Sequence, residues 1–328
     1  MPNGNFTTKI SFVIPCYRSE ATIEKVVGEI IDTVSQRKDR YDYEIICVND
    51  CSPDNVLSVL KRLAEQDEKI KVIDLSKNMG KHAAVMAGFS YASGEYIVNV
   101  DDDFQCPVYE LWRLLEPVEN DKCDFSTAKY KVKKQSAFKN FGSDVNMLMT
   151  RIMLNLPKGL RFENFSVMKR FVMEEIVKYD KPYPYLIGLI SRVTNRIAMV
   201  EMEERDRGDN NATGFTFRKS FSLWLNGFTA FSVKPLRIST ILGFILALAG
   251  FLYGLILVIR KILIPEIPAG YTSLIAVQLF IGGMIMIILG LIGEYVGRIY
   301  ICLNNTPQYV IKDEINTGKT KSSDHTGH

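Results

Sequence analysis

Two long segments without a charged residue lie near the C-terminal end of this 328-residue chain. They run from Ile238 to Ile259 and from Ile267 to Gly293, and each is long enough to cross a hydrocarbon layer of about 30 Å as a helix. Because only two such segments occur, the chain does not fit a polytopic transporter. The predicted organisation is a soluble domain over 1–230, two transmembrane helices within 231–302 (about 238–259 and 272–293), and a polar tail over 303–328 that is disordered after Asp313.

The two apolar segments are predicted to form a hairpin with both ends on one side of a membrane. Their connection, Arg260–Ser273, contains two prolines and two basic residues. Six basic residues flank the outer ends of the hairpin, so the positive-inside rule places the soluble domain in the cytoplasm. These six are Arg218, Lys219, Lys234, Arg237, Arg298 and Lys312.

Apolar patterning over the first 130 residues alternates between strand and helix. Such alternation predicts an α/β fold with a mostly parallel sheet, whose ligands bind beyond the carboxyl ends of the strands. The predicted strands are Lys9–Pro15, Tyr43–Asn49, Ile70–Leu75, Tyr96–Val100 and Cys123–Ala128, and the predicted helices are Thr22–Gln36, Pro53–Asp67, Lys81–Tyr91 and Val108–Glu119.

Beyond residue 130 the pattern is mainly helical. Residues 136–156 are predicted to form an amphipathic helix that either packs on the domain or lies in the membrane interface. Helices are also expected at Ser166–Tyr179, Tyr185–Asn195 and Arg218–Phe228, and a strand at Arg196–Glu201.

Charge and composition exclude several classes of function. The net charge is only +3, which does not suggest a nucleic-acid partner. Of the three histidines, His325 and His328 lie in the polar tail, so only His82 is left for a Ser-His-Asp mechanism, and such a hydrolase is not expected. Neither the GxGxxG nor the GxxxxGK[ST] pattern occurs, which argues against a dehydrogenase and a P-loop enzyme.

The strongest chemical signal is a run of three carboxylates, Asp101, Asp102 and Asp103, directly after a predicted strand. Crowded carboxylates repel one another unless a cation lies among them, and oxygen ligands favour Mg²⁺ or Mn²⁺. Asp101 and Asp103 can share one metal ion while Asp102 points away. The alternative is a solvated acidic turn.

Three further loops follow predicted strands. Asp50 can accept hydrogen bonds from a base or ribose, and Tyr17 can stack on a base. Lys81 opens a helix where it can meet a phosphate or remain solvated.

In order and spacing these four loops resemble family 2 glycosyltransferases. The usual patterns PVYNE, VDDGS-x-D, NxGK and DADLQDP correspond here to PCYRSE, VNDCSPD, NMGK and DDDFQCP. Phe165–Arg170, Glu203–Arg207, Ala212–Phe228 and the hairpin resemble a narrower branch, the membrane-bound polyprenyl-phosphate glycosyltransferases. The resemblance implies a type A (Rossmann-like) glycosyltransferase domain followed by a two-helix transmembrane hairpin.

The resemblance also implies roles for individual residues. Asp101 would contact the nucleotide or sugar, together with Lys81 and Asp102, and Asp103 and Gln105 would hold Mg²⁺ or Mn²⁺. Pro15, Tyr17 and Asp50 would line the base and ribose site. Asn49 and Cys51 replace the usual Asp and Gly, and Cys106 replaces an acidic residue or histidine.

The acceptor determines what else the site needs. A phosphate monoester is already anionic near pH 7, so it can attack a sugar without a dedicated general base. The site must instead supply positive charge. The resemblance places Lys129, Arg205 and Arg207 near the site, and Asp101 and Asp103 complete the expected catalytic set.

The resemblance therefore implies inverting transfer of a sugar from a nucleoside-diphosphate sugar to undecaprenyl phosphate, with UDP as the preferred nucleotide by family likeness. The predicted location is the bacterial inner membrane, and relatives with such a hairpin often form homo-oligomers. Two alternatives stay open. One is a transferase acting on a saccharide acceptor in capsule or O-antigen assembly, although the QxxRW motif of processive synthases is absent. The other is a membrane-anchored binding protein with a decayed site.

Overall fold

The computed structural model describes residues 7–130, 163–203, 205, 270–304 and 306–318, together with scattered residues between Ile241 and Leu263. These residues belong to two units. The first holds the N-terminal part of the chain up to Gly214, apart from Ile152–Asn155, together with Thr306–His328. The second holds Ile152–Asn155 and Phe215–Asn305.

The first unit is built on one eight-stranded sheet in the order β7-β5-β6-β4-β1-β2-β3-β8. Strands β1, β2, β3 and β4 are parallel neighbours, and β7 is parallel to β5, whereas β6 and β8 run antiparallel to their neighbours. The predicted α/β fold with a mostly parallel sheet is therefore confirmed. The strands are β1 Thr8–Cys16, β2 Tyr41–Asn49, β3 Ile70–Leu75, β4 Tyr96–Asn99, β5 Phe125–Tyr130, β6 Ser166–Lys169, β7 Ile197–Met202 and β8 Ile311–Ile315.

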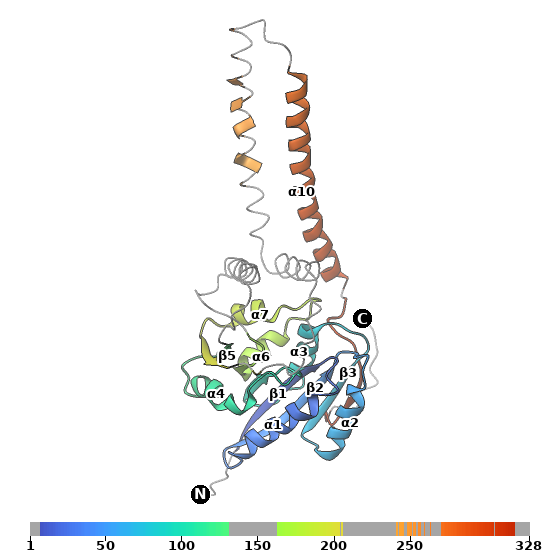
Figure 1. The fold of residues 1–328 in the computed structure, drawn as a ribbon, viewed down its shortest axis with the longest axis vertical. Coiled ribbons are helices and arrows are strands. Elements are labelled where there is room, and N and C mark those ends of the chain that lie inside the picture. Colours follow the sequence, from blue (N-terminus) through green and yellow to red (C-terminus); the bar gives the residue numbers. More distant parts are fainter. Residues whose placement is uncertain are drawn as a thin grey trace. The chain divides into compact units, whose positions relative to one another are not determined.

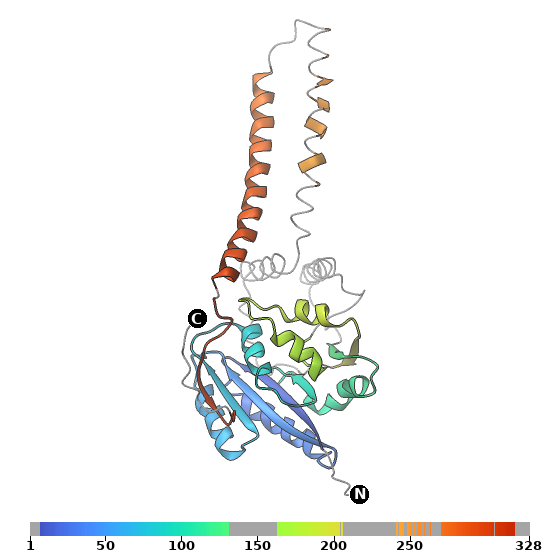
Figure 2. The same cartoon turned by 180° about the vertical axis from the view of Figure 1, so that it is seen from behind.

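Helices cover both faces of this sheet, as Figures 1 and 2 show from opposite sides. One face carries the main apolar core, in which alternate residues of β1 such as Phe12 and Ile14 meet buried residues of α1, α2 and α4. On the other face, Gly88 of α3 lies so close to the sheet that a Cβ atom there would be 2.4 Å from Val13 Cγ1. The helices are α1 Ile23–Ser35, α2 Val56–Gln66, α3 Lys81–Phe89, the 3₁₀ turn η1 Val108–Glu110, α4 Leu111–Glu119, α6 Arg170–Val177 and α7 Leu186–Val193.

Ser166–Lys169 corrects one prediction, because these residues form strand β6 and the helix begins only at Arg170. β6 lies between β4 and β5 and pairs with both. Its first three residues are all buried, so it lacks the apolar–polar alternation by which a half-exposed strand is recognised.

The chain after Asp313 is a second correction. It was expected to be disordered, but Ile311–Ile315 forms the edge strand β8, which pairs with β3. The side chain of Asn316 then donates to the carbonyl oxygens of Ala64 and Ile70 at 2.7 and 3.0 Å. These contacts attach the segment up to Gly318 to the first unit, and the rest of the predicted disordered tail lies outside the described residues.

In the second unit, α10 (Tyr271–Leu303) is a 33-residue helix that contains most of the predicted second apolar segment. By length and composition its part Phe280–Leu303 can cross a membrane, and it is the one such helix among the residues that the structure describes. The scattered residues described between Ile241 and Leu263, where the first segment was predicted, are helical. The predicted helices at 136–156 and 218–228 lie outside the described residues.

Candidate active site

The predicted site residues gather at one edge of the sheet. The loops after β1, β2, β3 and β4 all leave the sheet at this edge because these strands are parallel. The ends of β5 and β7 reach the same edge, since β4 and β5 both run antiparallel to β6 and β7 is parallel to β5. Three of these loops contain a non-glycine residue with a left-handed φ, namely Arg18 (59°), Cys51 (48°) and Phe104 (61°). Residues in this strained conformation often cluster at functional sites.

Asp101, the first carboxylate after β4, is held by two partners. One oxygen forms an ion pair with Nζ of Lys81, and the other accepts a hydrogen bond from Nδ2 of Asn164 at 2.9 Å. The structure thus brings together the predicted residues Lys81, at the start of α3, and Asp101, directly after β4. Asn164 was not predicted as a site residue, because nothing in its local sequence marks it.

Asp102 points back toward the loop after β1. Its Oδ2 accepts the backbone N–H of Tyr17 at 2.8 Å, and its carbonyl oxygen accepts from Oγ1 of Thr22 at 2.6 Å. Burial raises the pKa of Asp102 to about 6, and the negative charges of Asp101 and Asp103 act in the same direction. Asp102 therefore carries a carboxylate that is unusually easy to protonate, and it orients Tyr17.

Asp50, at the end of β2, is clasped by the loop after β3. Its two carboxylate oxygens accept the backbone N–H groups of Met79 and Gly80 at 2.7 and 2.9 Å. Gly80 has a φ of 85°, a conformation that favours glycine. Burial holds the pKa of Asp50 above its usual value, although these two hydrogen bonds favour the charged form. The loop after β2 and the loop that leads from β3 into Lys81 are thereby fixed to each other.

The remaining predicted nucleotide residues lie in and after β1. Pro15 is buried within β1, opposite Val48 of β2. Tyr17 follows the strand with its side chain 43% exposed, so the ring is accessible to a base. The backbone N–H of Arg18 donates to Oγ of Ser52 at 2.7 Å, which ties the loop after β1 to the loop after β2.

Two of the three predicted acceptor residues are described, and both are paired. Nζ of Lys129 is 2.7 Å from a carboxylate oxygen of Glu201. Arg205 forms a two-pronged ion pair with Glu29 of α1, and its backbone N–H donates to the carbonyl oxygen of Gln105 at 3.2 Å. Arg207 lies outside the described residues. Glu29 was missed by the sequence reasoning, because its distance from Arg205 in the chain hides the contact.

The residues at the end of β4 fit a divalent cation that is completed by substrate. Among the residues described in 7–130 and 163–203, no group of three or more His, Cys, Asp and Glu side chains is arranged to hold a metal ion by itself. Mg²⁺ commonly takes only one or two carboxylates and fills its remaining positions with phosphate oxygens and water. Asp103 and Gln105 supply oxygen atoms of the required kind. Neighbouring Cys106 does not contribute a thiolate, because burial raises its pKa to about 12.

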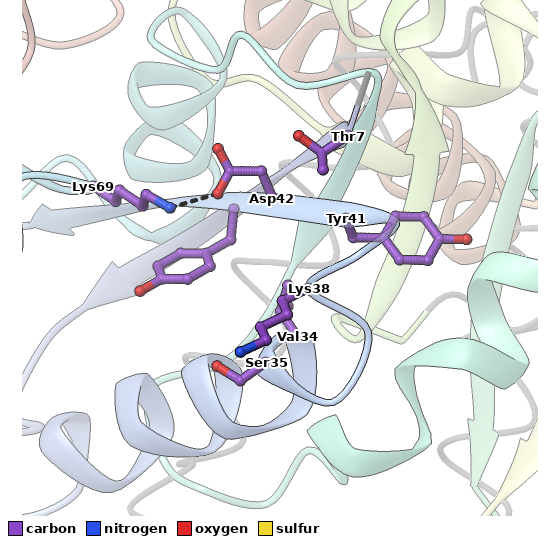
Figure 3. A pocket seen from close by; sticks show the side chains of 8 residues that line it. Thr7, Val34, Ser35, Lys38, Tyr41, Asp42 and Lys69 are labelled. Atoms are coloured by element: carbon purple, nitrogen blue, oxygen red, sulfur yellow. Dashed lines mark hydrogen bonds and ion pairs between the residues drawn. The ribbon is translucent and has the colours of Figure 1, made fainter. Parts of the chain in front are cut away.

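The opposite edge of the sheet contains a cavity of about 330 Å³ (Figure 3). It lies near the amino ends of β1, β2 and β3, where Lys69 and Asp42 form an ion pair at 2.6 Å. None of the predicted site residues lines this cavity. Its charged residues are therefore remote from the candidate site.

The mostly parallel sheet, with the acidic loop at the carboxyl ends of its strands, is the fold of a type A glycosyltransferase. Residues 11–177 match the model of glycosyl transferase family 2, and residues 234–299 match that of the GtrB C-terminal hairpin. The chain belongs to glycosyl transferase family 2. It is a glycosyltransferase, and the predicted family, fold class and enzyme class are confirmed.

Similar proteins match over nearly the whole chain. A prophage bactoprenol glucosyl transferase homolog from Escherichia coli is 32% identical, and the match covers 93% of this chain and 98% of that protein. An undecaprenyl-phosphate 4-deoxy-4-formamido-L-arabinose transferase from Proteus mirabilis is 28% identical, with 95% of each chain covered. Glucosyl-3-phosphoglycerate synthase from Mycobacterium tuberculosis, solved with Mn²⁺ and UDP-glucose, is 18% identical with a TM-score of 0.48 and covers 66% of this chain and 76% of that one.

Proposed function

We propose that this glycosyltransferase moves a sugar from a nucleoside-diphosphate sugar to a polyprenyl phosphate, with inversion at the anomeric carbon. The donor preferred here is a UDP-sugar, and the acceptor is undecaprenyl phosphate. The proposed site residues are those at the edge of the sheet where Asp50, Lys81, Asp101 and Asp103 lie.

One observation carries the proposal. Lys81, Asp101 and Asn164 come from three separate segments and meet in direct contact beside the loop that holds Asp103 and Gln105. The cation of Lys81 lies at the start of α3, where helix geometry favours an anion such as a phosphate. The arrangement supports binding of the donor diphosphate between Lys81 and the Asp103 loop, with the sugar near Asp101.

The reaction needs little proton chemistry in the protein if the acceptor is a phosphate. An acceptor oxygen forms the new bond to the anomeric carbon, while the bond to the donor diphosphate breaks and the nucleoside diphosphate leaves with the electron pair. Because the acceptor is already anionic near pH 7, no general base is required. The only histidine outside the polar tail, His82, supports this view: burial and the charge of Lys81 lower its pKa to about 4.

The leaving diphosphate needs positive charge. Mg²⁺ or Mn²⁺ held by Asp103 and Gln105 would supply that charge when bound. Lys129 and Arg207 are proposed to hold the acceptor phosphate, whereas Arg205, predicted from the sequence for the same role, is paired with Glu29. In the described residues Lys129 is paired with Glu201, and an anionic acceptor would compete with that carboxylate for the same ammonium group.

The membrane location is proposed on three grounds. The C-terminal part of the chain matches a hairpin model, α10 is long and apolar enough to span a membrane, and both relatives described above are named for bactoprenol or undecaprenyl phosphate. A polyprenyl phosphate stays in the bilayer, so its transferase must reach the membrane surface. Six basic residues flank the two ends of the hairpin, and two lie in its connecting loop. By the positive-inside rule, the proposed location is therefore a bacterial inner membrane, crossed twice, with the catalytic domain in the cytoplasm.

The proposal is tested by a transfer assay with full-length protein in membranes. Undecaprenyl phosphate, Mg²⁺ or Mn²⁺ and a panel of radiolabelled nucleotide sugars are added, and the label that enters the lipid phase is counted. Asp103→Ala and Asp103→Asn are compared with Asp42→Asn, which removes a carboxylate at the opposite edge of the sheet.

Label in the lipid phase that is lost with a chelator and with both Asp103 variants, but not with Asp42→Asn, would support the proposal and name the sugar. Transfer into a water-soluble saccharide without lipid label would overturn the proposed acceptor. Full activity in excess chelator would overturn the proposed metal.

A further inference from the structure

Asn49 and Asp74 form a buried polar pair beneath the loop that contains Asp50. Nδ2 of Asn49 donates to Oδ1 of Asp74 at 2.7 Å, and both residues are at most 5% exposed. They are opposite each other on the parallel strands β2 and β3. A carboxylate at position 49 would place two negative charges within hydrogen-bond distance and force one of them to take up a proton. Asp74 thus explains why an amide stands where the family pattern has aspartate.

The other oxygen of Asp74 faces the strand that follows the apolar helix in the chain. Nζ of Lys312 lies 3.8 Å from Oδ2 of Asp74. The register of β3 and β8 shifts at this point: Asp74 is opposite Asp313 and Leu75 is opposite Ile311, which makes Lys312 the extra residue on β8. Such a bulge redirects a side chain. Here it brings a cation to the buried carboxylate.

Asn49 also closes the turn that follows β2. Its Oδ1 accepts the backbone N–H of Ser52 at 3.2 Å, a bond that spans Cys51 with its left-handed φ of 48°. A non-glycine residue persists in that conformation only where its surroundings enforce it. Ser52 connects this turn to the loop after β1, because its hydroxyl donates to Asp54 at 2.6 Å and accepts the backbone N–H of Arg18.

We propose that Asn49 is a positioning residue for the donor site, fixed in place by Asp74, whose charge Lys312 balances from the C-terminal strand. The proposal rests on the proposed function in one respect, namely that the loop from Asp50 to Asp54 contacts the donor nucleotide. Donor binding then depends on a residue that follows the apolar helix in the chain, and not only on the N-terminal half.

The test uses full-length protein purified in detergent, and two measurements. The first is the affinity for UDP. The second is the rate at which iodoacetamide labels Cys51, an exposed thiol inside the turn, followed by mass spectrometry. The variants are Asn49→Asp, the exchange Asn49→Asp with Asp74→Asn, Lys312→Met, and the control Lys69→Met, which breaks an ion pair at the other edge of the sheet.

Asn49→Asp is expected to weaken UDP binding about ten-fold and to accelerate labelling of Cys51, because it replaces a hydrogen bond to a buried charge with repulsion. The exchange variant restores one donor and one acceptor, so most of the affinity should return. Lys312→Met should weaken binding only about two- to three-fold, since Lys312 is largely exposed. In transfer assays with Asn49→Asp, the KM for the donor should rise while kcat and the KM for the lipid stay unchanged.

The outcomes separate this proposal from the proposed function. If Asn49→Asp leaves both the UDP affinity and the Cys51 labelling rate unchanged, or if the exchange variant is no better than Asn49→Asp, the positioning role is refuted. If Cys51 labelling follows the expected order but the wild-type protein binds no UDP and transfers no sugar, the role of Asn49 in the turn is supported and the proposed function fails. A melting temperature for each variant identifies any that do not fold.

Discussion

Arg205 allows a decisive test between two roles. The sequence predicts that it binds the acceptor phosphate, whereas its contacts favour a clamp, that is, a residue that holds the acidic loop in place. Its guanidinium forms two bonds to Glu29, one of them between Nη1 and Oε2 at 2.7 Å. The same group lies 4.4 Å from the ring centroid of Phe104 and 4.9 Å from that of Tyr109. The backbone of Arg205 exchanges hydrogen bonds with Gln105. We therefore predict that the pair holds the acidic loop for the metal and the donor.

The expected loss of binding free energy follows from how far the Arg205–Glu29 pair is exposed to solvent. Hydrogen bonds to a charged group contribute about 1.5–3 kcal/mol. The side chains of Arg205 and Glu29 are 26% and 15% exposed, so solvent screening reduces this to about 1–2 kcal/mol. If the whole amount is lost from donor binding, the KM for the donor rises by about 5- to 30-fold.

The assay compares Glu29→Gln and Arg205→Ala with Glu24→Gln, which lies on the same helix and removes an exposed ion pair to Arg62. A clamp predicts that both variants of the Arg205–Glu29 pair raise the donor KM together and leave the lipid KM unchanged. A phosphate ligand predicts instead that Arg205→Ala alone raises the lipid KM. If Glu29→Gln keeps the donor KM within about two-fold of the wild type, the clamp argument is refuted.

Three further predictions concern stability and are measured by thermal melting of the purified protein. Gly94→Ala should destabilise the protein by about 1–3 kcal/mol, because its Cβ would lie 2.6–2.8 Å from Ser11 and the backbone of Lys9. Gly28→Ala, in an open position of α1, should instead stabilise it by about 1 kcal/mol. Equal melting temperatures of the two variants would contradict this reasoning. Cys51→Gly should relieve the left-handed backbone strain and leave stability unchanged or up to about 1 kcal/mol higher, and a loss of more than that would show that the thiol itself is needed. His82 should make the protein acid-sensitive, because its pKa is 6.5 in the unfolded chain and about 4 when folded. Up to about 3 kcal/mol of stability is therefore lost as the pH falls from 6.5 to 4. His82→Phe should flatten this pH dependence, and an unchanged dependence would refute the reasoning.

The sequence allows most residues of the candidate site to be grouped because its signals are local. A strand that ends in polar residues marks a loop, and parallel strands bring such loops to one edge, so Asp50, Lys81 and Asp101 could be grouped from the residue pattern alone. Long-range contacts leave no such signal. Nothing near Asn164 indicates that it bonds Asp101, and nothing near Glu29 indicates that it pairs with Arg205.

The strands that were missed have a related cause. The first three residues of β6 are buried, so the strand shows no alternation. β8 is short and partly polar, a pattern typical of a tail. Each becomes a strand only because a neighbouring strand offers hydrogen-bond partners. Pairing across a sheet is a property of the folded chain, and a single sequence window does not contain it.

The pairing of β8 with β3 has a consequence for how the protein is made. β3 ends at Leu75, and its edge partner is translated more than two hundred residues later, after α10. At roughly 5–20 residues per second, the ribosome leaves the edge of β3 uncovered for about 10 to 50 seconds. An unpaired edge strand is a template for aggregation. Newly made chains therefore pass through an interval in which the edge of β3 is open to pairing with another chain, until β8 completes the sheet.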